Sequence, residues 1–318
     1  MSRSTRSRST NIGAYKPVKP YTNSNDVLQD PVALRERAAR DGYLYFPGLV
    51  DTDALWSLRG RFEEILSRHG WTDDGTDPHD LITSRDAIIE GMPEFIPILE
   101  DFQRLEEFHA FAHDPGIVGM LARLFDDTVL VHPRNIGRIV FPTSPTTPPH
   151  QDYVHIQGTP DVWTGWIPLG DVPRALGGIR ILAGSHSEGV YPIQPMSGAG
   201  GVGVPTEGMP GEWVANDFKA GDVLFFHSQT IHEGLPNTSG DRVRLSVDYR
   251  YQAVSKPVTE GSLLPHFGRF SWDWVYEEWQ SKEFQYYWTD FDLELASFTG
   301  DVRRFIADGA TEPIHPEQ

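Results

Sequence analysis

Six short apolar or alternating segments follow one another between residues 129 and 251, and they constrain the fold more than any other feature. They cover residues 129–132, 136–141, 163–169, 179–183, 222–232 and 242–251, with Gly, Pro or Asn between them. Short segments of this kind, separated by turn residues, are typical of antiparallel β-sandwiches and barrels. The chain is therefore predicted to be mainly β, with its core at about residues 129–252.

The residues on either side of this core predict helices. Asp30-Pro31 is typical of a capped helix start, and that helix is expected to end at Asp41-Gly42. Apolar residues recur every three or four positions in a second helix that ends at His69-Gly70. A third is expected at residues 115–124, and the aromatic-rich residues beyond 265 are interpreted as further helices. We therefore expect one domain over residues 26–318, with helical flanks at 30–125 and 265–310.

Residues 1–25 differ in composition from the rest of the chain. They are rich in Ser, Thr and Pro, contain five Lys or Arg residues and have no acidic residue. Such a segment resembles an organelle transit peptide, but it lacks the apolar face of an amphipathic helix. A disordered basic tail is the preferred interpretation. No secretory signal is recognisable, so a cytoplasmic location is expected.

Composition limits the partners and the chemistry. The chain has no Cys, so any metal must be bound by His and carboxylate side chains. Its net charge of −18 disfavours nucleic acid and anionic membranes as partners. No apolar run approaches the roughly 20 residues that a membrane span needs. A small-molecule substrate is therefore expected, and nothing in the sequence indicates an oligomeric state.

His150-Gln151-Asp152 is the first candidate for a metal site, and it lies where the chain is expected to enter a strand. Side chains two positions apart in a strand project from one face, so this imidazole and this carboxylate can reach one point. Two histidines and one carboxylate on one side of an iron ion form the ligand set of many non-haem oxygenases. His-x-Asp alone is a weak signal, so a third ligand must come from elsewhere.

Residues 221–234 contain two candidates for that third ligand, His227 and His232. They are five positions apart, so they face opposite ways in a regular strand. One is expected to be a ligand, and the other to hydrogen-bond a backbone group in the core. Periodicity does not choose between them.

A strand rich in arginine follows. Arg242, Arg244 and Ser246 are expected to share one face of this strand, and Asp248 continues the same alternation. Arginine side chains that point into a β-domain are costly unless they meet an anion. A guanidinium group pairs well with a carboxylate, such as the distal one of 2-oxoglutarate. The alternative is a row of exposed charges along an edge strand.

One loop matches a nucleotide-binding string without its context. Gly198 to Gly203 reads G-x-G-x-x-G, but no helix-like segment follows it. A dinucleotide site needs a strand, a turn and a helix together. The segment is therefore interpreted as a flexible loop.

Taken together, these segments resemble the phytanoyl-CoA dioxygenase-like family of iron(II)- and 2-oxoglutarate-dependent oxygenases. The resemblance spans roughly residues 40–252 and depends on the order of four blocks. The blocks are His150-Gln-Asp152, Trp163-Thr-Gly-Trp166-Ile-Pro-Leu with Gly177-Gly178 and Gly184-Ser185-His186, residues 221–237, and the arginine-rich strand after Asp241.

The resemblance implies a double-stranded β-helix, that is, a jelly roll. It implies that His150, Asp152 and His232 bind Fe(II), with His232 preferred to His227. It also implies that Arg244, rather than Arg242, binds 2-oxoglutarate with help from Ser246, and that Trp166 borders this co-substrate. With O2, such an enzyme hydroxylates a C–H bond of a small molecule and releases succinate and CO2. The aromatic residues around Trp163 and Trp166 and at 272–288 hint at an apolar or flat substrate, as in secondary metabolism.

Acyl-CoA chemistry is not inherited from the family name, because no concentrated basic patch is visible for the phosphates of coenzyme A. Two alternatives remain at this point. One is a cupin-like isomerase or dioxygenase that uses the metal without 2-oxoglutarate. The other is a non-catalytic binding module that has kept the fold.

Overall fold

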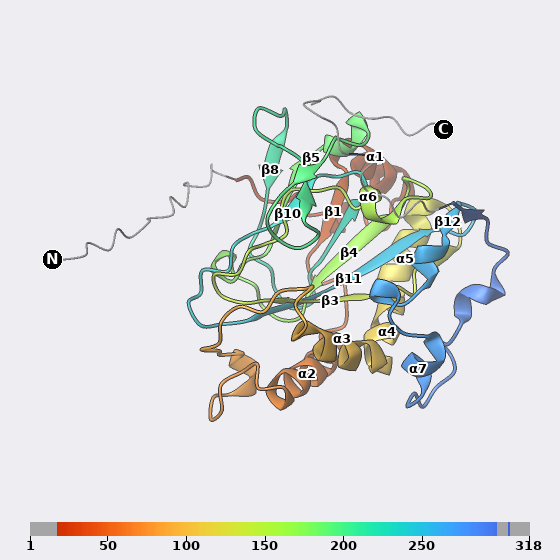
Figure 1. Cartoon of the computed structure of the whole chain (residues 1–318). Helices are drawn as coiled ribbons and strands as arrows, with labels where there is room; N and C mark the ends of the chain where they lie inside the picture. The colour runs from red at the N-terminus through yellow and green to blue at the C-terminus, as the bar shows by residue number, and fades with distance from the viewer. Residues whose placement is uncertain (1–17, 298–304, 306–318) are drawn as a thin grey trace.

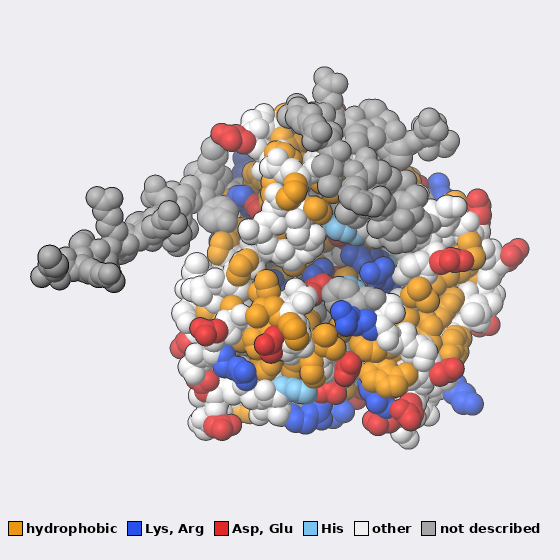
Figure 2. All heavy atoms as spheres, viewed as in Figure 1, with side chains coloured by type: hydrophobic (Ala, Val, Ile, Leu, Met, Phe, Trp, Pro, Cys, Tyr) orange, Lys and Arg blue, Asp and Glu red, His pale blue; other side chains and the backbone are white. Residues whose placement is uncertain are grey.

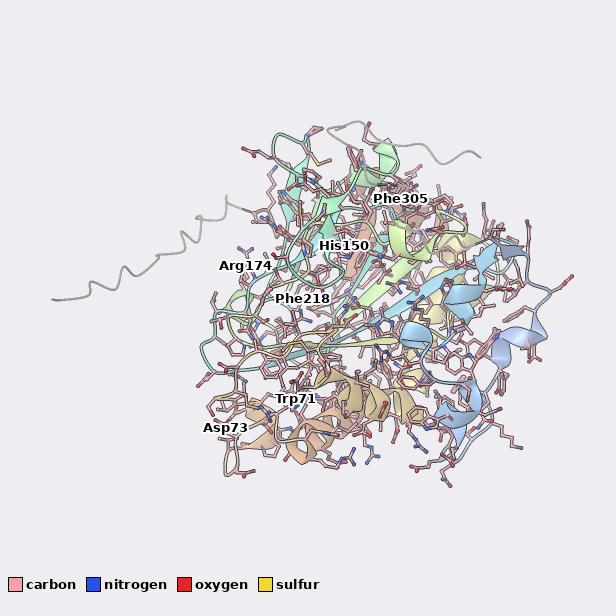
Figure 3. The ribbon with its side chains drawn as sticks, in the orientation of Figure 1. Trp71, Asp73, His150, Arg174, Phe218 and Phe305 are labelled. Atoms are coloured by element: carbon pink, nitrogen blue, oxygen red, sulfur yellow. The ribbon has the colours of Figure 1, made fainter. Side chains whose placement is uncertain are left out.

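The computed structural model describes residues 18–297 and Phe305. Figure 1 shows three layers: a small sheet, a large sheet, and a group of helices on the far side of the large sheet. Trp71 lies among the helices, whereas His150 and Phe218 lie on the side of the small sheet (Figure 3). One core lies between the helices and the large sheet, and another lies between the two sheets.

The large sheet has six strands in the order β1-β9-β4-β11-β2, and β3 also pairs with β11. Every pairing in it is antiparallel. The strands are β1 (Tyr43–Phe46), β2 (Val129–Val131), β3 (Ile136–Val140), β4 (Trp163–Pro168), β9 (Val223–His227) and β11 (Arg244–Ala253). The β-core therefore reaches back to β1, outside the predicted range, because β1 pairs with a strand far away in the sequence.

The small sheet has the order β10-β5-β8 and is also antiparallel. Its strands are β5 (Ile179–Ala183), β8 (Glu212–Val214) and β10 (His232–Gly234). Two further pairs lie outside both sheets, β6 (Gln194–Pro195) with β7 (Val202–Gly203) and β12 (Val258–Thr259) with β13 (Leu295–Ala296). The two sheets face each other and form a jelly roll. Side chains from both sheets point into the space between them.

Alternation along β11 separates the core from the interior of the jelly roll. Leu245, Val247, Tyr249 and Tyr251 belong to the core shared with the helices. The residues between them therefore point towards the small sheet, because successive side chains in a strand face opposite ways. These are Arg244, Ser246, Asp248 and Arg250, all buried. One strand thus contributes both the apolar support and the polar wall of the interior.

The helices on the outer face follow the local signals in the sequence. They are α1 (Pro31–Asp41), α2 (Thr52–Arg68), α3 (Phe95–Arg104), α4 (Glu106–Ala110) and α5 (Pro115–Phe125). Asp30 caps α1 and Gly42 ends it in a left-handed conformation. Asp114 caps α5 in the same way as Asp30 caps α1. The predicted N-terminal helices are confirmed. Two short helices, α6 (Tyr153–Ile156) and α7 (Trp272–Tyr276), come later in the chain.

Two predicted flanks differ from the structure. Residues 18–25 do not form a free tail, because Lys19 and Asn23 bridge to Val214 and Tyr45, and Tyr21 is buried. Residues 1–17 lie outside the described part. The C-terminal flank is mostly irregular: α7 is its one α-helix among the described residues, because clustered aromatic rings rather than helical periodicity hold it together. In the described part of the chain, no helix has the length and hydropathy of a membrane span.

Candidate active site

Three polar side chains converge between the two sheets. His150 forms an isolated bridge with His232, and Asp152 follows two residues later. Nε2 of His150 lies 3.6 Å from Oδ1 of Asp152, and Nε2 of His232 lies 3.9 Å from the same oxygen. One ligand atom from each residue lies within 4.8 Å of the others. The three largely buried side chains, called the triad below, can therefore surround one metal ion.

Backbone carbonyl groups determine which nitrogen of each triad histidine carries a proton. Nδ1 of His150 donates to the carbonyl of Pro148 at 2.9 Å, and Nδ1 of His232 donates to that of Thr230 at 3.0 Å. Each Nε2 therefore keeps its lone pair on the side of Asp152. Burial, followed by the neighbouring His150, lowers the pKa of His232 to about 3. Two neutral imidazoles and a carboxylate suit iron(II), so these residues fit the metal.

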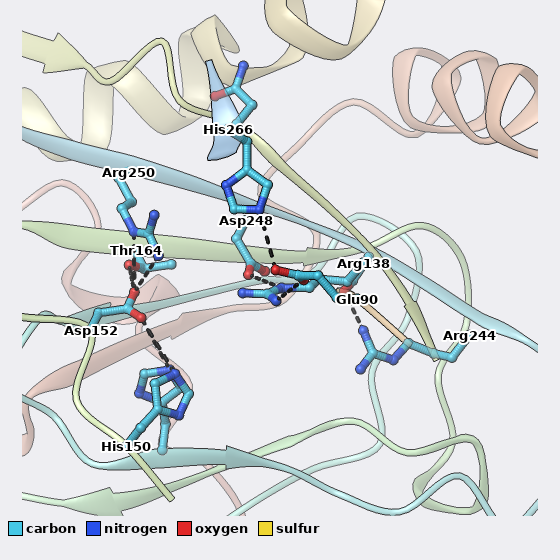
Figure 4. Close-up of polar contacts among 12 residues, drawn as sticks. Glu90, Arg138, His150, Asp152, Thr164, Arg244, Asp248, Arg250 and His266 are labelled. Atoms are coloured by element: carbon cyan, nitrogen blue, oxygen red, sulfur yellow. Dashed lines mark hydrogen bonds and ion pairs between the residues drawn. The ribbon is translucent and has the colours of Figure 1, made fainter. Parts of the chain in front are cut away.

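Two neighbours on the large sheet position Asp152 and keep it anionic. The hydroxyl of Thr164 donates to Oδ2 at 2.6 Å, and Nη2 of Arg250 lies 3.4 Å from the same oxygen (Figure 4). Thr164 on β4 and Arg250 on β11 are cross-strand partners, so the register brings both to this carboxylate. Burial favours the neutral acid, but the Arg250 guanidinium holds the pKa of Asp152 well below its usual value.

The segment around Asp152 is not the predicted strand. His150 makes one bridge, but Asp152 has helical dihedral angles and directly precedes α6. The two side chains meet because the chain turns there, and not because they share the face of a strand. His155 on α6 lines the cavity beside His150, and their ring centroids are 6.4 Å apart.

His232 and His227 lie in different sheets. His227 ends β9 of the large sheet, whereas His232 begins β10 of the small sheet. Nε2 of His227 lies 3.7 Å from Oδ1 of Asp161, away from the triad. The two histidines therefore do not share a strand, as the spacing had suggested, because the intervening residues carry the chain from one sheet to the other.

Arg244, Ser246 and Trp166 lie together at one end of the cavity. Nε of Arg244 donates to the carbonyl of Gly177 at 2.9 Å, and Nη1 donates to the hydroxyl of Ser246. The guanidinium carbon lies 5.6 Å from the ring centre of Trp166. Burial lowers the pKa of Arg244 to about 10, and no carboxylate among the described residues forms an ion pair with it. A buried cation without a counter-ion is costly, which favours binding of an anion there.

Arg242 does not reach the site. β11 begins only at Arg244, and the chain before it bridges to Ile82. Arg242 is exposed, its Nε donates to the carbonyl of Asp80 at 3.1 Å, and its Nη2 lies 3.8 Å from the Asp80 carboxylate. The expectation that Arg242 shares the interior face with Arg244 is therefore wrong.

Arg138 belongs to a buried ion network that was not predicted from the sequence. Its Nη1 lies 2.9 Å from Glu90, and its Nε lies 2.8 Å from Asp248 (Figure 4). Nε2 of His266 lies 3.5 Å from the other oxygen of Glu90. Although burial opposes it, Asp248 and Glu90 raise the pKa of Arg138 above its usual value. Arg138 is paired with Ser246 in the β3–β11 register, so the same alternation that places Ser246 also places Arg138.

The cavity beside the triad extends to the Gly-rich loop. Ala199, Gly200 and Val202 line it together with Arg134 and His155. Figure 2 shows Lys, Arg and His side chains around a hollow near the middle of this face. The loop therefore lies at the cavity, beside the triad.

A sequence model of the phytanoyl-CoA dioxygenase (PhyH) family matches residues 38–245. This range is more than half of the chain and contains the triad and Arg244. The chain belongs to the phytanoyl-CoA dioxygenase family. It is an iron(II)- and 2-oxoglutarate-dependent oxygenase, as the resemblance implied. Neither the cupin-like enzyme without 2-oxoglutarate nor the non-catalytic module is supported.

Two similar proteins are 1-deoxypentalenic acid 11-beta-hydroxylases. That of Streptomyces arenae is 28% identical over 262 residues, which cover 77% of this chain and 89% of the relative. That of Streptomyces exfoliatus is 26% identical with the same coverage.

Solved structures confirm the predicted jelly-roll fold. One is the epimerase SnoN, solved in complex with Fe3+, alpha ketoglutarate and nogalamycin RO. It is 21% identical to this chain, the match covers 72% of this chain and 87% of SnoN, and the TM-score is 0.52. The carbocyclase SnoK from nogalamycin biosynthesis is 22% identical over 75% of this chain and 88% of its own, also with a TM-score of 0.52.

Proposed function

We propose that this oxygenase hydroxylates a C–H bond of a small secondary metabolite, with His150, Asp152 and His232 as its iron ligands. The observation that carries the proposal is the convergence of two free Nε2 lone pairs and one carboxylate oxygen beside an unpaired buried arginine. The two similar Streptomyces proteins are hydroxylases by name, which supports hydroxylation as the outcome.

Arg244 is the proposed anchor for the 5-carboxylate of 2-oxoglutarate. Ser246 and Gly177 fix its guanidinium group, and Trp166 covers one side of it. Because these partners are neutral, the positive charge of Arg244 stays available for the co-substrate. The same pocket is lined by His150, His232 and Asp152, so the co-substrate can reach Arg244 and the metal together.

The residues position the reactants and exclude water from them. Bound iron(II), 2-oxoglutarate and O2 supply the oxidising chemistry, and the co-substrate leaves as succinate and CO2. Thr164 and Arg250 hold Oδ2 of Asp152, which leaves Oδ1 for the metal. The burial of the triad keeps bulk water from the reacting C–H bond.

The first test is the visible difference spectrum of the protein with Fe(II) and 2-oxoglutarate in the absence of oxygen. The iron chelate of 2-oxoglutarate absorbs weakly in the visible range, so no substrate is needed. We expect a band in the wild type and none in Asp152→Ala or His232→Ala. If either variant kept the full band, the ligand assignment would be wrong.

Arg244 and Arg242 form a matched pair for testing the anchor. Arg244→Gln is expected to weaken 2-oxoglutarate binding at least about tenfold, because a charged hydrogen-bonding partner of the co-substrate is lost. Arg242→Gln removes the same charge from an exposed position two residues away and should leave the affinity unchanged. A titration of the visible band with 2-oxoglutarate measures both. Equal effects in the two variants would exclude Arg244 as the anchor.

A further inference from the structure

The cavity around the triad contains one more positive charge than negative. Among the described residues that line it, four guanidinium groups face three carboxylates: Arg134, Arg138, Arg244 and Arg250, with Glu90, Asp152 and Asp248. Burial lowers the pKa of His266 to about 4, so this ring is neutral near pH 7. Iron(II) and the 2-oxoglutarate dianion add opposite charges of equal size. One cation therefore stays uncompensated after both have bound.

Among the four guanidinium groups, Arg134 is the one to which no anion is assigned. Arg138 is paired with two carboxylates and Arg250 with Asp152, and Arg244 is the proposed anchor for the co-substrate. Arg134 forms no ion pair with a described residue: Nη1 donates to the carbonyl of Gly261 at 3.2 Å, and its buried Nε has no hydrogen-bond partner. A mostly buried guanidinium group in this state favours an anionic ligand.

The backbone around Arg134 is fixed before any ligand binds. Arg134 lies between β2 and β3, and the amide of His132 donates to the carbonyl of Arg250 at 2.8 Å. On the other side, Nε2 of Gln103 donates to the carbonyl of the buried Asn135 at 3.1 Å. Hydrogen bonds on both sides of Arg134 in the chain therefore hold its backbone at the cavity wall, as expected of a preformed binding residue.

Arg134 and Arg244 mark two neighbouring compartments of the cavity. Both compartments are lined by Arg138, His150 and Asp152. Trp166 and His232 complete the one that contains Arg244. The compartment with Arg134 is completed by His155, Ile136 and the loop residues Gly200 and Val202. It therefore combines one free cation with apolar contacts, beside the triad and away from the co-substrate anchor.

We propose that the substrate is a small, mainly apolar monocarboxylic acid whose carboxylate binds Arg134. The proposal rests on the proposed function and adds the substrate class to it. A single excess charge suits a monoanion, and it is too little for the several phosphate charges of a coenzyme A thioester. The carboxylate would pair with Arg134 while the hydrocarbon part lies against Ile136 and Val202, next to the triad.

The test uses matched acids and amides on the protein loaded with Fe(II) and saturating 2-oxoglutarate, without oxygen. Cyclohexanecarboxylate and adamantane-1-carboxylate are titrated calorimetrically against the corresponding carboxamides. At least one carboxylate should bind at least about tenfold more tightly than its amide, because only the acid forms a charged pair. Arg134→Gln should abolish this preference and Arg134→Lys should restore part of it. Arg61→Gln, on the exposed face of α2, is the matched control and should behave like the wild type.

The visible band of the iron and 2-oxoglutarate chelate separates the possible failures. No band in the wild type would count against the proposed function itself. A normal band in Arg134→Gln shows that this variant is folded and loaded. With the band present, the proposal is overturned if no carboxylate outbinds its amide, if the preference survives in Arg134→Gln, or if the acids compete with 2-oxoglutarate.

Discussion

Thr164 shows how a single hydroxyl group can control the metal site. It donates to Oδ2 of Asp152 at 2.6 Å from a cross-strand position and contacts no proposed metal-binding atom itself. Thr164→Val keeps the shape of the side chain but leaves Oδ2 without its shortest hydrogen bond. Residues that orient a metal ligand in this way typically contribute 10- to 100-fold to metal affinity. We therefore expect Fe(II) affinity to fall about tenfold or more, as measured by competition with a chelator.

The control for this change is Thr289→Val. Thr289 also donates a hydrogen bond, to the carbonyl of Tyr286 at 2.7 Å, but it is exposed and lies outside the site. The Thr289→Val variant should bind Fe(II) with the same affinity as the wild-type protein. If Thr164→Val bound iron with unchanged affinity, the position of Asp152 would have to depend on Arg250 and the backbone alone.

At the scale of elements, the Gly-rich loop is held against the segment that carries His150. A Cβ atom at Gly198 would lie 1.9 Å from the carbonyl oxygen of Thr146, and the φ angle there is +121°. Gly201 also has a positive φ angle, +67°, but a Cβ atom there would meet nothing within 4 Å. Gly201→Ala thus introduces only the backbone strain, whereas Gly198→Ala also pushes the loop away from its neighbour.

Gly198→Ala is accordingly expected to lower the free energy of unfolding by about 2 kcal/mol or more, and Gly201→Ala by about 1 kcal/mol. Urea denaturation measures both values. The displaced loop in Gly198→Ala should also be cleaved faster within residues 189–211 in limited proteolysis. Equal losses in the two variants would show that the loop is not packed on residue 146.

Helices and strands with local signals could be predicted, whereas the pairing of strands that lie far apart in the sequence could not. The Asp-Pro starts of α1 and α5 and the Gly42 end of α1 are visible in the sequence because caps act within a few residues. The place of β1 in the large sheet is decided by its pairing with β9, which no local pattern reveals.

The same distinction applies to the site. The triad and Arg244 were predicted from motifs and from the family resemblance. Arg250 was missed although it follows the alternation of Arg244, Ser246 and Asp248, so the signal was present in the sequence. Arg134 lies in a loop without periodicity, and its role becomes visible only when the ion pairs of its neighbours are known.

At the scale of the whole molecule, the charge of the cavity is opposite to that of the chain. The protein carries a net charge of −18, whereas the cavity lining has an excess of guanidinium groups. The acidic surface disfavours polyanions at long range, and burial preserves the attraction of the cavity for an anion that enters it. Among anions, a small monoanion is repelled least by the acidic surface. It is still attracted by the buried guanidinium groups of the cavity. Net charge alone therefore says little about the substrate of this enzyme.

Stability of the whole fold is expected to fall in mild acid because of buried histidines outside the site. Nε2 of His109 donates to the carbonyl of Gln103 at 2.9 Å, and its Nδ1 accepts from Asn135 at 3.2 Å, so the ring ties α4 to α3 and to the residue before β3. Burial lowers the pKa of His109 to about 4. In the unfolded chain the pKa is about 6.5. The unfolded state therefore binds the proton more readily between these two values.

It follows that the contribution of His109 is complete above about pH 6.5 and is lost as the pH falls towards 4, by up to about 3 kcal/mol. His113 and His132, with pKa values lowered by burial to about 4 and about 3, act in the same direction. Urea denaturation at a series of pH values should show a decline in stability from pH 6.5 to pH 4.

His109→Gln should be less stable at pH 7, but its decline should be shallower by up to about 1.4 kcal/mol per pH unit, since one proton fewer is taken up on unfolding. Parallel curves for the two proteins would mean that His109 titrates alike in the folded and unfolded states, and the buried neutral ring would then not be the source of acid sensitivity.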